Sequence, residues 1–154
     1  MDLAQYQMTC PHETRDRSQN IGSSGPRRKS HGLSNGDYGI NWAHRYLRES
    51  KAELSAASKT KLWFVASGFA VSSMRKSQAA IYCVLGDPET VESVVRSHLS
   101  SELYDMDVLL RTLVRIERLI TSSDLELGHA STKSCLTDAA RIHEAAQKIV
   151  DLMA

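Results

Sequence analysis

The chain has 154 residues, of which 42% are hydrophobic and 24% charged, and its net charge is +1. This composition is too apolar for a wholly disordered protein and fits one globular domain, with or without a tail. Its longest uncharged run, the thirteen residues from Leu62 to Met74, is shorter than the roughly twenty needed to cross a bilayer, so neither a membrane span nor a membrane partner is predicted.

The number and spacing of the cysteines bear on the redox state of the protein's compartment. Cys10, Cys83 and Cys135 are odd in number and widely separated, unlike a disulfide framework. We therefore predict free thiols and a cytoplasmic location.

The first part of the chain is predicted to be a flexible tail. Residues 1–39 are rich in turn-forming pairs such as Gly25-Pro26 and Asn35-Gly36, and they contain few periodic apolar residues. The remainder, residues 40–154, is predicted to form one helical bundle.

Two helices are predicted to form a hairpin after the tail. The first begins near Asn41, a good N-cap, and carries one apolar stripe at steps of three and four residues. The second is apolar on nearly every side, which predicts a central helix with neighbours on several faces. Its first aromatic residues, Trp63 and Phe64, are predicted to be core anchors. Gly86 suits the position after its last turn, where a positive φ is needed.

Three further helices are predicted in the second half. Asp87-Pro88-Glu89 combines a capping aspartate, a proline at the first helical position and an acid in the first turn. An amphipathic pattern predicts a fourth helix over 103–121, a loop over 121–136, and a last helix from Thr137 to Met153. The predicted fold is all-α, an up-and-down bundle of about five helices with a four-helix core.

Charge is distributed unevenly between the two halves of the predicted bundle. Residues 41–86 carry seven basic and two acidic side chains, a net charge of +5, whereas residues 87–154 carry seven basic and twelve acidic ones, a net charge of −5. Either the halves attract each other, within one fold or across a homodimer, or the basic hairpin contacts a phosphate backbone. The candidate nucleic-acid-binding residues are Arg45, Arg48, Lys51, Arg75 and Lys76.

Common catalytic and cofactor-binding motifs do not occur in the sequence. It contains no GxxxxGK[ST], GxGxxG, HExxH, CxxC or GxSxG pattern, so no cofactor and no metal site is predicted. Its histidines could still titrate near neutral pH. For each of them, a solvated or partly packed side chain is the competing interpretation.

The pattern and order of the helices resemble those of HEPN domains over residues 42–154. The hairpin WAHRYLRESKAELSAASKTKLWFVASGFAVSSMRKSQAAIYCVLGDP is similar to that family's opening helix pair, in which an aromatic YL..A...L..A pattern precedes an alanine-rich helix that ends in leucine-glycine. Ser97-His98-Leu99 resembles the step before the family's middle helix, and DAARIHEAAQKIVDLM resembles its closing helix.

This resemblance implies a bundle that often dimerises, in a family of RNA-cleaving toxins and non-catalytic helpers. Its ribonucleases carry an arginine followed, after four to six residues, by a histidine. Here no histidine has an arginine five, six or seven positions before it. A degenerate, metal-independent ribonuclease would have to join Arg96 or Arg118 with His98 or His129 through the fold.

The sequence therefore favours a non-catalytic helical interaction module over an enzyme. Such a module would dimerise or dock a partner protein, with RNA contacts through the basic hairpin. The alternatives are the degenerate ribonuclease and a small nucleic-acid-binding subunit of a ribonucleoprotein complex.

Overall fold

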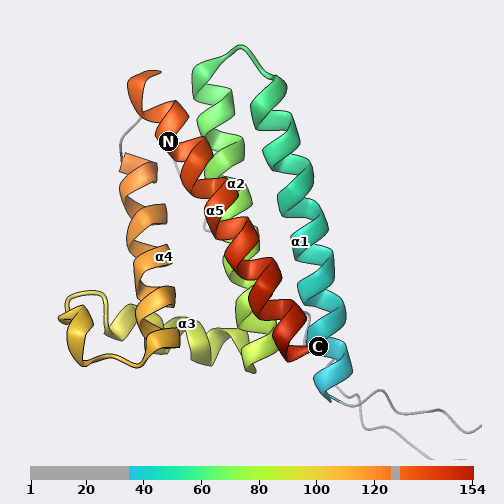
Figure 1. The fold of residues 1–154 in the computed structure, drawn as a ribbon, viewed down its shortest axis with the longest axis vertical. Coiled ribbons are helices and arrows are strands. Elements are labelled where there is room, and N and C mark those ends of the chain that lie inside the picture. The colour runs from blue at the N-terminus through green and yellow to red at the C-terminus, as the bar shows by residue number, and fades with distance from the viewer. Residues whose placement is uncertain (1–34, 126–128) are drawn as a thin grey trace, which may run out of the picture.

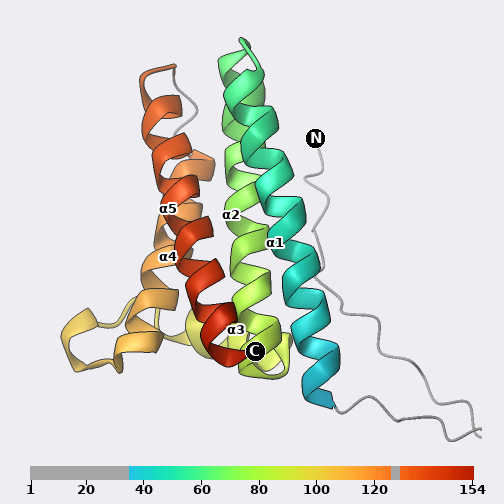
Figure 2. The same cartoon turned by 45° about the vertical axis from the view of Figure 1, so that its right-hand side comes forward.

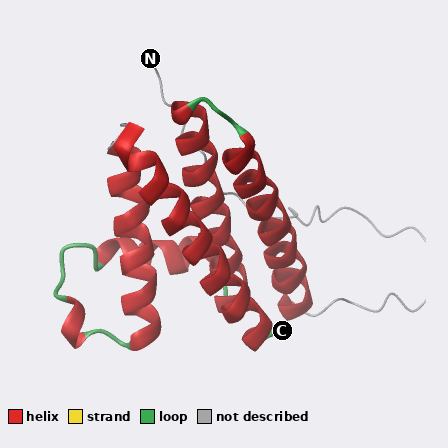
Figure 3. Cartoon of the chain, turned by 45° about the horizontal axis from the view of Figure 1, so that its top comes forward, coloured by secondary structure: helices red, strands yellow, loops and turns green. Residues whose placement is uncertain are grey.

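The computed structural model describes residues 35–125 and 129–154, which form helices and loops without a strand (Figure 3). The predicted all-α fold is confirmed. The elements are α1 (Asn35–Lys59), α2 (Trp63–Leu85), α3 (Pro88–Ser97), the 3-10 turn η1 (Leu103–Asp105), α4 (Val108–Leu125) and α5 (His129–Met153).

The four long helices run up and down, and α3 crosses one end of the bundle (Figures 1 and 2). Helix α2 packs mainly on α1 and α5 and also contacts α3 and α4. This central position explains why its sequence is apolar or small on nearly every side, since several of its faces meet other helices.

The turn between α2 and α3 forms as predicted. Gly86 has a φ of +144°, and its N–H donates to the Tyr82 carbonyl at 3.2 Å. The Asp87 carboxylate accepts from the Thr90 N–H at 2.9 Å and from its hydroxyl at 2.6 Å. These bonds satisfy groups that would otherwise be left open at the two helix ends.

Helix α1 begins earlier than predicted. It starts at Asn35 instead of Asn41, so residues 35–39 belong to the helix and not to a tail. Two packing contacts account for the extension: the Tyr38 ring meets Trp42 edge to face, with centroids 6.2 Å apart, and Gly39 lies against the Cys83 carbonyl of α2. The tail predicted for residues 1–34 lies outside the described residues.

The boundaries predicted around the last two helices are also wrong. The fourth helix is divided into η1 and α4 because Met106 is extended and the Asp107 carboxylate caps α4, accepting from the Leu109 N–H at 2.8 Å. The predicted loop over 121–136 is largely helical, since α4 continues to Leu125 and α5 begins at His129. Packing of this segment on α2 outweighs its polar composition.

The predicted anchoring by Trp63 and Phe64 is wrong. Their side chains are 37% and 55% exposed, at the end of the molecule where α1 turns into α2. The large, fully buried hydrophobic side chains of α2 are instead Met74, Ile81 and Tyr82. The core lies in the middle of the bundle and towards the α2–α3 turn.

Candidate functional site

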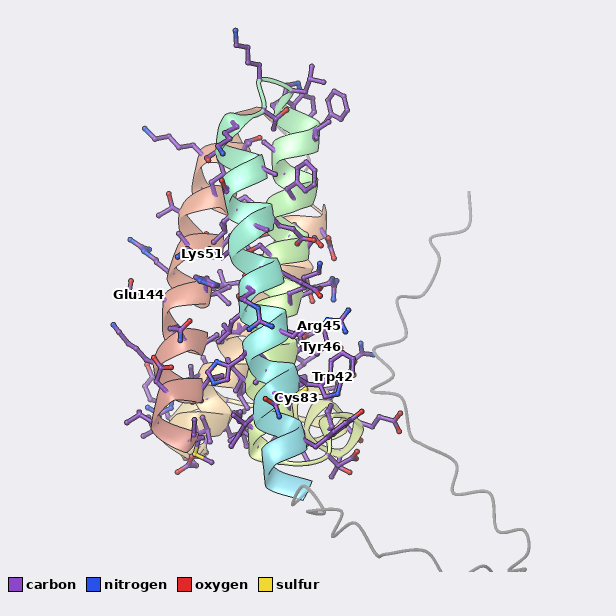
Figure 4. All side chains as sticks on the ribbon, turned by 90° about the vertical axis from the view of Figure 1, so that its right-hand side faces the viewer. Trp42, Arg45, Tyr46, Lys51, Cys83 and Glu144 are labelled. Atoms are coloured by element: carbon purple, nitrogen blue, oxygen red, sulfur yellow. The ribbon has the colours of Figure 1, made fainter. Side chains whose placement is uncertain are left out.

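A groove between α1 and α5 is lined by two histidines, an arginine, a lysine and a glutamate. It measures about 510 Å³ and is lined by His44, Leu47, Arg48, Lys51, His143, Glu144 and Gln147. The α1 members recur at steps of three and four residues, so they share one helix face. Figure 4 shows Lys51 and Glu144 on the same side of α1, and Trp42, Arg45 and Tyr46 on the other.

A buried polar cluster lies next to this groove and holds one of its histidines. The Ser50 hydroxyl of α1 lies 2.8 Å from the Ser73 and Ser77 hydroxyls of α2 and 3.0 Å from His143 Nδ1 of α5. A hydroxyl donates one hydrogen bond and accepts two, so these three partners use its whole capacity. The cluster links the three central helices and leaves Nε2 as the ring nitrogen of His143 for an external partner.

Burial and a neighbouring cation change the acid–base behaviour of His143. Removal from water lowers its pKa below the ordinary value of 6.5, and the charge of Lys51 lowers it further. Both effects oppose the imidazolium form. His143 is therefore neutral at neutral pH.

The five cations predicted to bind nucleic acid fall into two groups. Three are already paired: Arg45 with Glu49 at 2.9 Å, Arg75 with Asp124, and Lys76 with Glu49 at 3.1 Å and Glu53 at 2.7 Å. Arg48 and Lys51 are exposed and have no ion-pair partner among the described residues. These two also line the groove.

Among the paired cations, Lys76 joins α2 to α1, Arg75 joins α2 to α4, and Arg45 pairs within α1. Arg45 also lies 4.8 Å from the centre of the Trp42 ring, a cation–π distance. Burial alone would raise the pKa of Glu49, but hydrogen bonds from Arg45 and Lys76 hold it below its usual value. For Lys76, burial alone would lower the pKa, and hydrogen bonds to Glu53 and Glu49 raise it instead.

Comparison with family models, curated proteins and solved structures found no match to this chain. The resemblance to HEPN domains therefore stays a prediction.

The weak catalytic candidates have local structural contacts. Arg96 pairs with Glu92 at 2.6 Å, and His98 Nδ1 lies 2.8 Å from the Val94 carbonyl. Arg118 donates to the carbonyls of the α3–η1 connection, at 2.7 Å to Leu99 and 2.8 Å to Ser101. His129 begins α5, and its side chain lies outside the described set. No described histidine hydrogen-bonds to an arginine in the residues that the structure covers.

Two other polar features are built into the bundle. Gln78 donates to the buried Glu117 carboxylate at 2.6 Å and to the Tyr82 hydroxyl at 2.9 Å. Burial and the nearby charge of Glu117 together raise the pKa of Tyr82 well above its ordinary range. A smaller hollow of about 180 Å³ includes Cys135, and burial raises the pKa of its thiol, which disfavours the reactive thiolate.

Metal and membrane features are lacking over residues 35–125 and 129–154. No three His, Cys, Asp or Glu side chains there are grouped as metal ligands would be. No helix in the same ranges is both long enough and apolar enough to span a bilayer.

Sequence reasoning did not predict that His44 and His143 line one groove. The two positions lie 99 residues apart on helices that the sequence does not orient relative to each other. The usable signal was the α1 spacing of His44, Arg48 and Lys51, which already predicts a shared face.

Proposed function

We propose that this chain is a non-catalytic binding module whose α1–α5 groove holds a phosphate group of an RNA strand. One observation carries the proposal: Arg48 and Lys51, unpaired within the described residues, line the same groove as two histidines. Free cations converging on a concave surface suit an anion, since they need not give up an existing ion pair to bind it.

The side chains of the groove complement each other as phosphate ligands. A guanidinium group can donate two parallel hydrogen bonds to a phosphate, and an ammonium group adds a point charge. In the tautomer whose Nδ1 accepts from Ser50, His143 presents Nε2–H as a neutral donor. The negative charge of Glu144, which also lines the groove, is offset by Lys148, whose Nζ lies 2.8 Å from Glu144 Oε1.

The proposal is tested by fluorescence polarisation with a short labelled single-stranded RNA over a series of salt concentrations. Each phosphate contact to a single strand contributes about −0.7 to the slope of log K against log salt. Arg48→Gln and Lys51→Gln should each weaken binding and make this slope shallower by about 0.7.

Arg45→Gln is the matched control, because Arg45 is on the same helix and exposed but engaged with Glu49 and Trp42 outside the groove. It should change affinity much less than either groove variant. Equal losses from all three substitutions would show that net charge, and not the groove, determines binding.

The two imidazoles favour a second candidate, metal-independent RNA cleavage. In the tautomer whose Nδ1–H donates to Ser50, the lone pair of His143 Nε2 is free, and the lowered pKa keeps it available. His143 would take the proton of a ribose 2′-hydroxyl as that oxygen attacks phosphorus. The 5′-oxygen would leave with a proton from His44, giving a 2′,3′-cyclic phosphate and a 5′-hydroxyl.

This candidate predicts RNA cleavage in the presence of a chelator, and loss of cleavage with His143→Ala, His44→Ala or a 2′-deoxy substrate. His98→Ala is the control, since His98 lies outside the groove. RNA that binds at the groove but remains intact would leave the non-catalytic module as the function.

A further inference from the structure

One end of the molecule carries exposed apolar side chains surrounded by basic charge. We call this surface the hairpin tip; it consists of Lys59, Lys61, Leu62, Trp63 and Phe64, where α1 turns into α2. Leu62 and Phe64 are each 55% exposed. The chain has no acidic residue between Glu53 and Asp87, and neither lysine has an ion-pair partner among the described residues. Large apolar side chains exposed together mark a contact surface more often than isolated ones do.

Another surface carries exposed carboxylates and exposed apolar side chains, and the guanidinium groups of Arg111 and Arg118 donate to the backbone carbonyls beside them. We call it the acidic corner; it consists of Glu102, Tyr104, Asp105, Asp107 and Val108, around η1 and the start of α4. Tyr104 is 89% exposed and Val108 73% exposed. All three carboxylates are exposed and, within the described ranges, none takes part in an ion pair.

These two surfaces cannot meet within one molecule. The α1–α2 turn lies at one end of the bundle, and η1 lies near the other (Figure 1). Helix α2, whose 23 residues lead from the tip to the opposite end, is roughly 35 Å long at about 1.5 Å per residue. A contact between the two surfaces would therefore have to join two molecules.

We propose that copies of this chain associate head to tail, with the hairpin tip of one packed on the acidic corner of the next. Opposite charges steer the encounter and set its orientation, while Leu62 and Phe64 on Tyr104 and Val108 bury apolar surface. Because two different surfaces meet, a pair of copies keeps one free tip at one end and one free corner at the other, so assembly continues into a chain or closes into a ring. This inference goes beyond RNA binding, because neither surface includes a groove residue.

Complementing variants of the full chain test the proposal by analytical ultracentrifugation. The tip variant is Lys59→Glu with Lys61→Glu, and the corner variant is Glu102→Lys with Asp105→Lys. Asp107 is left intact because it caps α4. Wild-type protein should form species that grow with concentration and shrink with added salt, and each variant alone should be monomeric.

The decisive sample is an equimolar mixture of the two variants. The tip variant keeps its acidic corner and the corner variant keeps its basic tip, and the two reversed surfaces are again opposite in charge, so the mixture should regain the association that each variant alone has lost. Arg115→Glu with Arg141→Glu is the matched control, since it changes net charge by the same amount as the tip variant at exposed positions of α4 and α5 that belong to neither surface. It should assemble as the wild type does.

Several results would overturn the proposal. They are a wild-type monomer at every concentration, a mixture that stays monomeric, or a dimer that survives in both single variants. Loss of binding to phosphatidylserine–phosphatidylcholine vesicles in the tip variant, without any wild-type self-association, would assign the tip to a lipid surface instead. Arg48→Gln and Lys51→Gln should leave assembly unchanged, which separates this test from that of RNA binding.

Discussion

Replacing Ser50 by alanine should destabilise the bundle more than the loss of one small polar group suggests. The side chain is fully buried, and its hydroxyl bonds to Ser73, Ser77 and His143 on two other helices. Removing it leaves these three polar groups without that partner. A buried group left unsatisfied costs about 1–3 kcal/mol.

Two effects reduce the expected loss below the sum of three such penalties. The serine hydroxyls can turn to a carbonyl in the preceding turn of their own helix, and water in the groove can reach His143. We therefore expect Ser50→Ala to lower the free energy of unfolding by about 2–3 kcal/mol, near the cost of one or two orphaned groups.

Urea unfolding followed by circular dichroism measures this loss at neutral pH. Ser55→Ala is the matched control, because Ser55 is on the same helix and exposed, and it should change stability by less than about 0.5 kcal/mol. If Ser50→Ala lies as close to wild type as this control, the interhelical hydroxyl cluster contributes no net stability and the reasoning is refuted.

Three further predictions concern packing, pH and capping. Gly39→Ala places a Cβ 2.4 Å from the Cys83 carbonyl oxygen and should destabilise the protein by about 2 kcal/mol or more. At Gly68 an added Cβ meets nothing within 4 Å, so Gly68→Ala should stabilise the protein by up to about 1 kcal/mol. Equal shifts in the melting temperatures of the two variants would contradict this reasoning. Because the folded-state pKa of His143 lies below 6.5, the stability that its neutral form gives the fold is complete above that pH and is lost as pH falls towards the lowered pKa. The pH dependence of the free energy of unfolding should therefore be shallower in His143→Gln, and an unchanged profile would exclude the effect. Asp87→Ala removes the α3 cap and should cost about 1 kcal/mol in urea unfolding, and a value near zero would mean that Pro88 and packing suffice.

Short-range residue preferences made the boundary between α2 and α3 predictable from the sequence. The boundary between α2 and α3 follows from Gly86 and Asp87-Pro88, whose preferences act within a few residues. The early start of α1 and the helical segment after His129 were not predicted, because each depends on contacts with α2. Gly39 meets Cys83, and the Thr132 hydroxyl lies 3.0 Å from Ser67.

The candidate site was only half predictable, for a related reason. Five cations of the predicted hairpin were candidates for nucleic-acid binding, and nothing in the sequence separates those that form ion pairs from those that do not. The fold separates them, since Asp124 neutralises Arg75 from 49 positions away, while Arg48 and Lys51 face α5. Their proximity to His143 depends on how two helices pack.

By itself, the sequence determined that this chain is helical, where most of its helices lie and that α2 is the central one. Those properties follow from periodicity and capping, which act over one or two turns. Only the tertiary structure decided which charges are paired, that Trp63 and Phe64 face outwards, and that His44, Arg48, Lys51 and His143 share a groove. Such arrangements arise from contacts between distant segments, and a helix's own pattern does not specify which partner will cover each part of its surface.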